Sequence, residues 1–477
     1  MDVGAPDLIT ALPDDMLVEI LVRLRCSRAA ARTGGLSRSW RGLWTRLPIH
    51  VFRGVALGSV QAALASIKAE GGPGASVTLL DISVPEASLS ESELRERVPK
   101  LLDAAAELSP VEFRLAVWEN TPFKYVKVVV PRFPRATSVE LQGLDLAFAD
   151  QPCSWQGFPA LERLSLTSCR AVLTNLLRRC PRLRVLRLRD DLLVCQHTNI
   201  IIKSSSLQEL DVENRVPFLH RIHIHAPALK RLAMSFASSN NIIVSVSVSA
   251  PVLEKVSWRC RYSTVSTGLG VSVGLGPWGL LSVRLQTAET NGQVHPHVHV
   301  LSLFAAAHTS YRFSEGLNLT TEIERHMVTL FSVLELHVQT LGHVFGAFAL
   351  HIFDIERIRT NTESLKVILM RSEDNEACPE NCACELPNNN WRSQTISGTM
   401  TKLEKVEIKG FQGEDHEFDF LKLIFSCVPN LKTMSVRLAD DIAESNDCCQ
   451  KIHDVFKAYF MECNVDVRSP WVNMQLP

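Results

Sequence analysis

The middle of the chain repeats one short pattern of apolar residues, and this pattern decides the fold. It reads LERLSL at 161–166, LRVLRL at 183–188, LQELDV at 207–212, LKRLAM at 229–234 and LEKVSW at 253–258. Successive copies begin 22, 24, 22 and 24 residues apart, and a less regular copy, ATSVEL, occupies 136–141. Such regular spacing indicates that one structural unit is repeated along the chain.

Each copy predicts a short strand. Its last two apolar positions alternate and point to the interior, while the polar residue between them faces the open side. One repeat cannot cover its own apolar face, so neighbouring repeats stack into a solenoid, and this period is typical of leucine-rich repeats. We therefore predict an α/β fold with a leucine-rich repeat solenoid over residues 110–375. The candidate target-binding residues are the open-side positions Ser165, Arg187, Asp211, Ala233 and Ser257.

Beyond Trp258 the period is lost, although strand and helix patterns continue. Further inner strands are predicted at 331–336 and 365–370, with a helix between them over 344–355. An exposed loop is expected at 371–395 because its polar residues, prolines and cysteines show no periodicity. The remaining segments are predicted as strands at 403–409, 431–438 and 463–467, and as helices at 415–426 and 449–460.

The N-terminal segment LPDDMLVEILVRL, residues 12–24, predicts an amphipathic helix. Pro13 suits its first position, and the two aspartates that follow favour the positive end of the helix dipole. Ser27 is expected to cap a second helix over 28–32 that ends near Gly34-Gly35. A third helix is predicted from the spacing of Leu36, Trp40, Leu43 and Trp44. Three such short helices bury little surface alone, so they need a partner.

These residues, with LSRSWRGLW at 36–44, resemble the F-box, and the double tryptophan resembles its plant members. The resemblance implies that residues 8–48 dock onto a Skp adaptor, which links the chain to cullin and RING subunits. Gly34-Gly35 departs from the family pattern and predicts a looser second helix and weaker binding. By position, the resemblance implies adaptor contacts from Leu12, Pro13, Leu17, Ile20, Leu21, Leu24, Leu36, Trp40 and Leu43.

The C-terminal block LEKVEIKGFQGEDHEFDFLKLIFSCVPNLKTMSVRL, residues 403–438, resembles the FBD module of plant F-box proteins, as does PENCACELPNNNW at 379–391. We expect an FBD module at 390–468 that caps the solenoid. Together the resemblances imply a substrate receptor of an SCF-type ubiquitin ligase, which presents a target protein on the solenoid. Such a receptor is not an enzyme and needs no catalytic residue, cofactor or metal.

Composition excludes several other classes. The net charge is −1, with 46% hydrophobic and 21% charged residues, as in soluble globular proteins. Residues 23–53 hold eight arginines and no acid, but no stacking platform or nucleic-acid motif accompanies them. Docking to an acidic protein explains these arginines equally well, and Skp adaptors are acidic by family resemblance. We therefore expect no nucleic-acid partner, and we expect no membrane partner either. With no signal peptide and no apolar run of about 20 residues, and thirteen cysteines expected to be reduced, we expect a nuclear or cytoplasmic location.

Two alternatives stay open. The first is a leucine-rich scaffold whose F-box does not bind the adaptor. The second is an enzyme built around Ser272 of GVSVG, or around His223, His225, His295, His297 and His299, which alternate on predicted strands. The GLGPWG segment at 274–279 lacks a following helix, so it does not favour a nucleotide site. Cys378, Cys382 and Cys384 lack an evident fourth ligand, so no metal is expected there.

Overall fold

The computed structural model divides into two compact units, each described by itself. Unit 1 comprises residues 1–216, 221–230 and 249–252, and unit 2 comprises 217–220, 231–248 and 253–477. None of the described helices combines the length and the hydropathy that a membrane span requires. The residues that the structure describes are 12–70, 76–84, 90–117, 126–147, 157–189, 199–214, 219–238, 244–262, 273–290, 292–307, 319–371, 382, 384, 391, 398–439, 446–459 and 464–468.

Unit 1 begins with a helical module, defined here as residues 12–48. Its helices are α1 (Asp14–Arg23) and α2 (Ser27–Thr33). The predicted third helix is wrong: the chain forms two 3-10 turns, η1 (Arg38–Trp40) and η2 (Leu43–Arg46), because Gly42 between them adopts a left-handed φ of 76°. Ser27 does not cap α2 either, since it is the first helical residue and its hydroxyl accepts a hydrogen bond from the Val51 amide at 2.8 Å.

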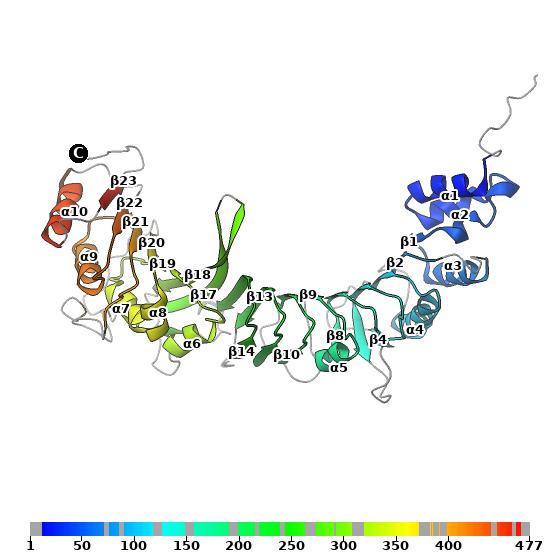
Figure 1. Cartoon of the computed structure of the whole chain (residues 1–477), viewed down its shortest axis with the longest axis horizontal. Helices are drawn as coiled ribbons and strands as arrows, with labels where there is room; N and C mark the ends of the chain where they lie inside the picture. The colour runs from blue at the N-terminus through cyan, green and yellow to red at the C-terminus, as the bar shows by residue number, and fades with distance from the viewer. Residues whose placement is uncertain are drawn as a thin grey trace, which may run out of the picture. The chain divides into compact units, whose positions relative to one another are not determined.

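A parallel sheet follows the module (Figure 1). The strands predicted from the repeat are confirmed, and parallel strands also precede residue 110. The leucines of the repeat are buried in these strands; Leu186 and Leu188, for example, are 0% exposed. Neighbours along the sheet are β1 (Ile49–Arg53), β2 (Leu79–Val84), β3 (Glu112–Val117), β5 (Ser138–Gln142), β7 (Arg163–Thr167), β9 (Val185–Arg189) and β11 (Glu209–Glu213).

The other side of unit 1 is closed by helices and by short strands. Helix α3 (Leu57–Glu70) packs against α4 (Glu91–Glu107), which begins with a capping box formed by Ser90 and Glu93. Further along, β4 (Val126–Val129), β6 (Leu144–Ala147) and β8 (Arg170–Ala171) form a second parallel sheet. Between the layers, the rings of Phe113, Phe133 and Phe158 stack at centroid distances of 4.8 and 5.9 Å.

Unit 2 explains why the repeat period is lost after Trp258. Strands β13 (Arg231–Ser238) and β15 (Lys255–Tyr262) are parallel, but β15 then pairs with a long antiparallel hairpin of β17 (Trp278–Thr290) and β18 (Gln293–Ala307). The tip of this hairpin projects beyond the neighbouring strands in Figure 1. Parallel pairing resumes through β19 (Val333–Gln339), β20 (Ser364–Met370), β21 (Lys405–Phe411), β22 (Thr433–Leu438) and β23 (Asn464–Arg468).

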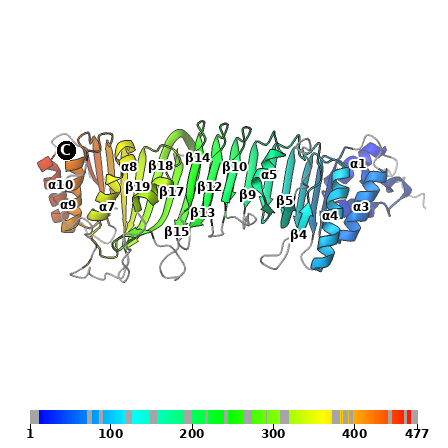
Figure 2. The ribbon, with the colours of Figure 1, turned by 90° about the horizontal axis from the view of Figure 1, so that it is seen from below.

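The helices predicted after residue 340 are confirmed, with shifted ends. They are α7 (Gly346–Asp354), α9 (Asp415–Cys427) and α10 (Asn446–Tyr459), and α6 (Leu319–Arg325) and α8 (Glu356–Asn361) complete the described helices of unit 2. Helices α7 and α9 lie side by side in Figure 2. The Phe420 ring of α9 contacts Phe345 and Phe353 at centroid distances of 4.9 and 6.3 Å, so aromatic packing holds this layer.

Candidate interaction surfaces

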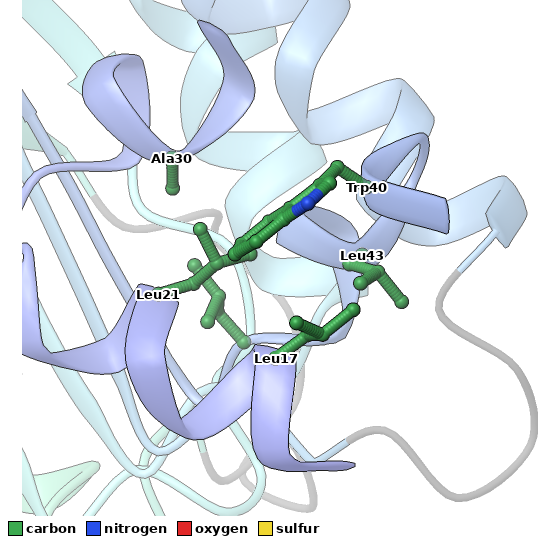
Figure 3. Close-up of a cluster of buried hydrophobic side chains, with 6 residues drawn as sticks. Leu17, Leu21, Ala30, Trp40 and Leu43 are labelled. Carbon is green, nitrogen blue, oxygen red and sulfur yellow. The ribbon is translucent and has the colours of Figure 1, made fainter. Parts of the chain in front are cut away.

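The helical module has a small core of its own (Figure 3). The Trp40 side chain packs among Leu17, Leu21, Ala30 and Leu43, and all five are buried. Leu12 is half-buried against the same core. Of the predicted adaptor-contact residues, Leu17, Leu21, Trp40 and Leu43 therefore lie inside the module, where they shape its surface.

The remaining predicted contacts lie on the outside of the module. Ile20, Leu24 and Leu36 are 40%, 44% and 72% exposed, and Pro13 is exposed as well. Met16, which the adaptor-contact prediction omits, is 54% exposed and lies one turn before Ile20. We call Pro13, Met16, Ile20, Leu24 and Leu36 the apolar stripe. Its α1 members recur every three or four residues, so they occupy one side of the helix.

Positive charge accompanies the apolar stripe. Two arginines of the module have acidic partners: Arg46 binds Asp14 at 3.1 Å and Arg23 approaches Glu19 at 3.9 Å. Five others are exposed and form no ion pair among the described residues: Arg25, Arg28, Arg32, Arg38 and Arg41. A surface that combines apolar side chains with uncompensated cations is complementary to an acidic protein partner.

The open side of the sheet in unit 1 carries three of the predicted target-binding residues. Ser165 and Asp211 each pair in register with Arg187 on the strand between them, and none of the three is buried. Ion pairs cross this face, including Arg189 to Asp211 at 2.7 Å and Arg114 to Glu140 at 3.7 Å. Its charges are therefore largely balanced between strands.

The open side of unit 2 is different. The predicted residues Ala233 and Ser257 are register neighbours, and beside them lie Arg259, Arg261 and Arg284, which we call the arginine cluster. Burial, followed by the charges of the other two arginines, lowers the pKa of Arg284. No member forms an ion pair among the described residues, and the Arg284 Nε atom is buried without a hydrogen-bond partner there.

An aromatic pair supports the arginine cluster. The Arg284 guanidinium carbon lies 4.2 Å from the centre of the Phe304 ring, and Phe304 stacks on His337 at 4.1 Å. Nearby, a hydrogen bond from His337, followed by the charge of Lys366, lowers the pKa of Glu335 to about 2. Lys366 and His337 already pair with the Glu335 carboxylate, so this carboxylate does not balance the positive charge of the arginine cluster.

A buried polar network links β15 to α6, and the sequence analysis missed it. The Trp258 indole donates to His326 Nδ1 at 3.2 Å, and an indole N–H can only donate, so the imidazole proton lies on Nε2. That atom is 2.8 Å from the Tyr262 hydroxyl, which donates to Glu322 at 3.0 Å. The partners lie about 60 residues apart in the sequence, so no local motif indicates the network.

The histidines considered for enzymatic chemistry are divided between β12 (Arg221–His225) of unit 1 and β18 of unit 2. His299 is buried against Thr287, whereas His295 and His297 are exposed, as are all residues of β18 from Gln293 to Val298. His223 and His225 lie on β12. Ser272 lies outside the described residues.

The strands and surfaces described above define a leucine-rich repeat protein with an N-terminal helical module. Residues 103–273 match a family model described as "FBD-associated F-box protein At5g56370, LRR repeats". This match confirms, within the repeat region, the resemblance to plant F-box, leucine-rich repeat and FBD proteins. Comparison with curated proteins and with solved structures gives no significant match.

Proposed function

We propose that this chain is the substrate receptor of an SCF-type ubiquitin ligase. The observation that carries the proposal is the apolar stripe of the helical module, together with five exposed arginines of the module that form no ion pair among the described residues. An apolar contact would supply affinity for a Skp adaptor, and the arginines would steer an acidic partner into place. The similarity of the repeats to those of FBD-associated F-box proteins supports this assignment.

In this proposal the chain performs no bond chemistry. It holds a target protein close to a charged ubiquitin-conjugating enzyme, and ubiquitination is faster because the target lysine is present at a high effective concentration. Ubiquitination of the target would take place in the nucleus or cytoplasm. The open faces of the two sheets are the proposed target-binding surfaces.

Assembly of the ligase tests the proposal. The full chain, co-expressed with a plant Skp adaptor, cullin and RING subunit, should co-purify with all three. An Ile20→Ser, Leu36→Ser double variant should lose them, because it removes apolar contact area at exposed positions without touching the core of the module. The matched control is Val129→Ser, Val172→Ser, which changes two exposed valines of unit 1 outside the module.

A well-folded wild-type chain that fails to co-purify would contradict the receptor role and favour the scaffold alternative. Variants of Leu17, Leu21 or Trp40 are unsuitable as a first test, since truncating a buried side chain costs about 2–5 kcal/mol. Loss of binding by such a variant would report unfolding of the module as readily as loss of a contact.

The arginine cluster indicates which chemistry the target offers to unit 2. The three guanidinium groups repel one another and have no acidic partner among the described residues, so a carboxylate-rich segment that lies across β15 and β17 would relieve the repulsion. The aromatic pair of Phe304 and His337 would support apolar side chains of the same segment. We therefore propose that the target binds this face through an acidic segment.

A fluorescent glutamate-rich dodecapeptide is the probe for this part of the proposal. Its binding to the full chain should weaken with salt, and should fall at least tenfold in an Arg259→Ser, Arg261→Ser variant. A Lys402→Ser, Lys405→Ser variant of the same unit is the control. Equal binding of a lysine-rich peptide, or no change in the arginine variant, would contradict the acidic-target assignment and leave the adaptor result standing.

A further inference from the structure

Three side chains of unit 2 that are chemically suited to bind a metal come together between two connecting segments. His343 follows the turn after β19, where Leu341 and Gly342 both adopt positive φ angles. Cys382 and Cys384 belong to the connection between β20 and β21. The Cys382 sulfur lies 3.1 Å from His343 Nδ1, and the ligand atoms of all three residues lie within 4.8 Å of one another.

We propose that His343, Cys382 and Cys384 form a zinc site, where they supply three of the four tetrahedral ligands. This proposal replaces the expectation from the sequence that no metal binds at these cysteines. Thiolate sulfur and imidazole nitrogen are the ligands that zinc prefers in proteins, while calcium and magnesium prefer oxygen. Tetrahedral geometry with zinc–sulfur bonds of about 2.3 Å and zinc–nitrogen bonds of about 2.0 Å separates neighbouring ligand atoms by about 3.5–3.8 Å. Here the Cys382 sulfur and His343 Nδ1 are 3.1 Å apart and no pair of ligand atoms is farther apart than 4.8 Å, so side-chain movements alone can bring the three ligands onto one ion.

Burial makes these three residues an enclosed site. His343 and Cys384 are 1% and 3% exposed, and Cys382 is half-buried. The connection is anchored nearby: the buried Trp391 ring packs so closely on Gly346, the first residue of α7, that any side chain there would overlap it. Zinc would give the same connection a second attachment, to the turn before α7.

Among the cysteines that the structure describes, Cys382 and Cys384 are the ones that belong to a group of three possible metal ligands. Burial raises the pKa of Cys169 and of Cys180 to about 12, so both remain thiols within the core of unit 1. Among the described residues, one group of at least three histidine, cysteine or acidic side chains lies close enough to share an ion. It consists of His343, Cys382 and Cys384. Cys378, the third cysteine of the predicted loop, lies outside the described residues.

Metal content of the purified full chain tests the site directly. We expect one equivalent of zinc per wild-type chain, and loss of at least nine-tenths of it in a Cys382→Ser, Cys384→Ser variant and in His343→Ala. Cys449→Ser, which changes a half-buried cysteine on α10 of the same unit, should keep its zinc. Circular dichroism establishes that each variant is folded.

A second measurement needs no variant. Cobalt added to the zinc-free wild-type chain should give a thiolate-to-cobalt charge-transfer band and tetrahedral d–d bands, and chelation should lower the melting temperature. A wild-type chain without zinc and without these bands would overturn the proposal. Full zinc retention in the double cysteine variant, or a Cys382–Cys384 disulfide found by mass spectrometry, would overturn it equally. None of these readouts depends on adaptor binding.

Discussion

At Gly34 and Gly35 the helical module lacks side chains, although neither residue needs the conformational freedom of glycine. Gly34 has a φ of −58°, and a Cβ atom on Gly35 would meet its nearest neighbour, the Arg32 carbonyl oxygen, at an ordinary 3.5 Å. Gly143 is the contrasting case, because its φ is 76° and a Cβ atom would overlap the Val117 carbonyl oxygen. Gly34-Gly35 thus departs from the F-box pattern in residue type, while the helix α2 still forms with both glycines present.

Gly35→Ala should raise the free energy of unfolding by about 0.4–1 kcal/mol, because alanine restricts the unfolded chain where the folded backbone accepts it. Chemical denaturation of the full chain measures the change, and Trp40 fluorescence reports the unfolding of the module. Gly143→Ala is the matched comparison and should destabilise unit 1. A destabilising effect of Gly35→Ala would contradict the geometry described for the end of α2.

Tyr262→Phe removes only the hydroxyl that bonds to Glu322 and His326 in the buried network. We expect the free energy of unfolding to fall by about 1–3 kcal/mol, because buried polar partners lose their hydrogen bond. Thermal unfolding of unit 2 is the readout, and Thr360→Ala, which removes an exposed hydroxyl, serves as control. Equal stability of Tyr262→Phe and wild type would show that the network contributes little.

At the scale of elements, β1 couples the helical module to the sheet. His50 on this strand is 0% exposed and lies between the rings of Trp44 and Phe52, with centroid distances of 6.3 and 6.2 Å. Burial lowers the pKa of His50 from 6.5 to about 4. The imidazole is therefore neutral in the folded chain at neutral pH.

This histidine makes stability depend on pH. The pKa of His50 is lower in the folded state than in the unfolded state, so its contribution to stability is complete above about pH 6.5 and is lost as the pH falls toward 4. Between pH 7 and pH 5 the loss is ~2 kcal/mol. Denaturation at both pH values should show this loss in wild type and a smaller one in His50→Leu. His225→Leu, at an exposed position of unit 1, should behave like wild type; an equal pH effect in His50→Leu would contradict the prediction.

Elements with local signals could be predicted from the sequence, and elements defined by distant contacts could not. The leucines of β7 and β9 alternate within five residues, so burial of one face follows from the sequence alone. The β17–β18 hairpin was not predicted, because its pairing with β15 replaces the parallel arrangement that the repeat implies.

The candidate surfaces show the same limit. Six apolar residues occupy α1, and the sequence does not say which of them face inward, because Leu17 and Leu21 become the buried pair by packing on Trp40 of η1. The sequence analysis did not place His343 beside Cys382, since 39 residues separate the two and the fold alone brings them together.

At the scale of the whole molecule, each unit extends a parallel sheet by adding strands, and the last strand of such a sheet needs protection. In unit 2 the last described strand is β23, and α10 buries Ile452 and Phe456 against the preceding layer. The Phe456 ring meets Phe425 of α9 at 5.2 Å. This arrangement supports the expectation that the C-terminal segment caps the repeats.

Deleting residues 446–477 should therefore expose the β22 edge and the apolar side of α9. We expect increased binding of a hydrophobic dye and concentration-dependent aggregation, measured by fluorescence and light scattering. Deleting only residues 469–477 leaves α10 and β23 in place and is the control. A monomeric, dye-negative long deletion would contradict a capping role.

The affinity of the purified full chain for a plant Skp adaptor tests the central claim most directly. By calorimetric titration we expect wild type and the Val129→Ser, Val172→Ser control to bind equally, with an affinity that weakens with salt. Ile20→Ser, Leu36→Ser should bind at least tenfold more weakly while its circular dichroism and melting temperature stay unchanged. Undetectable binding by folded wild type, or equal binding by the stripe variant, would contradict the account.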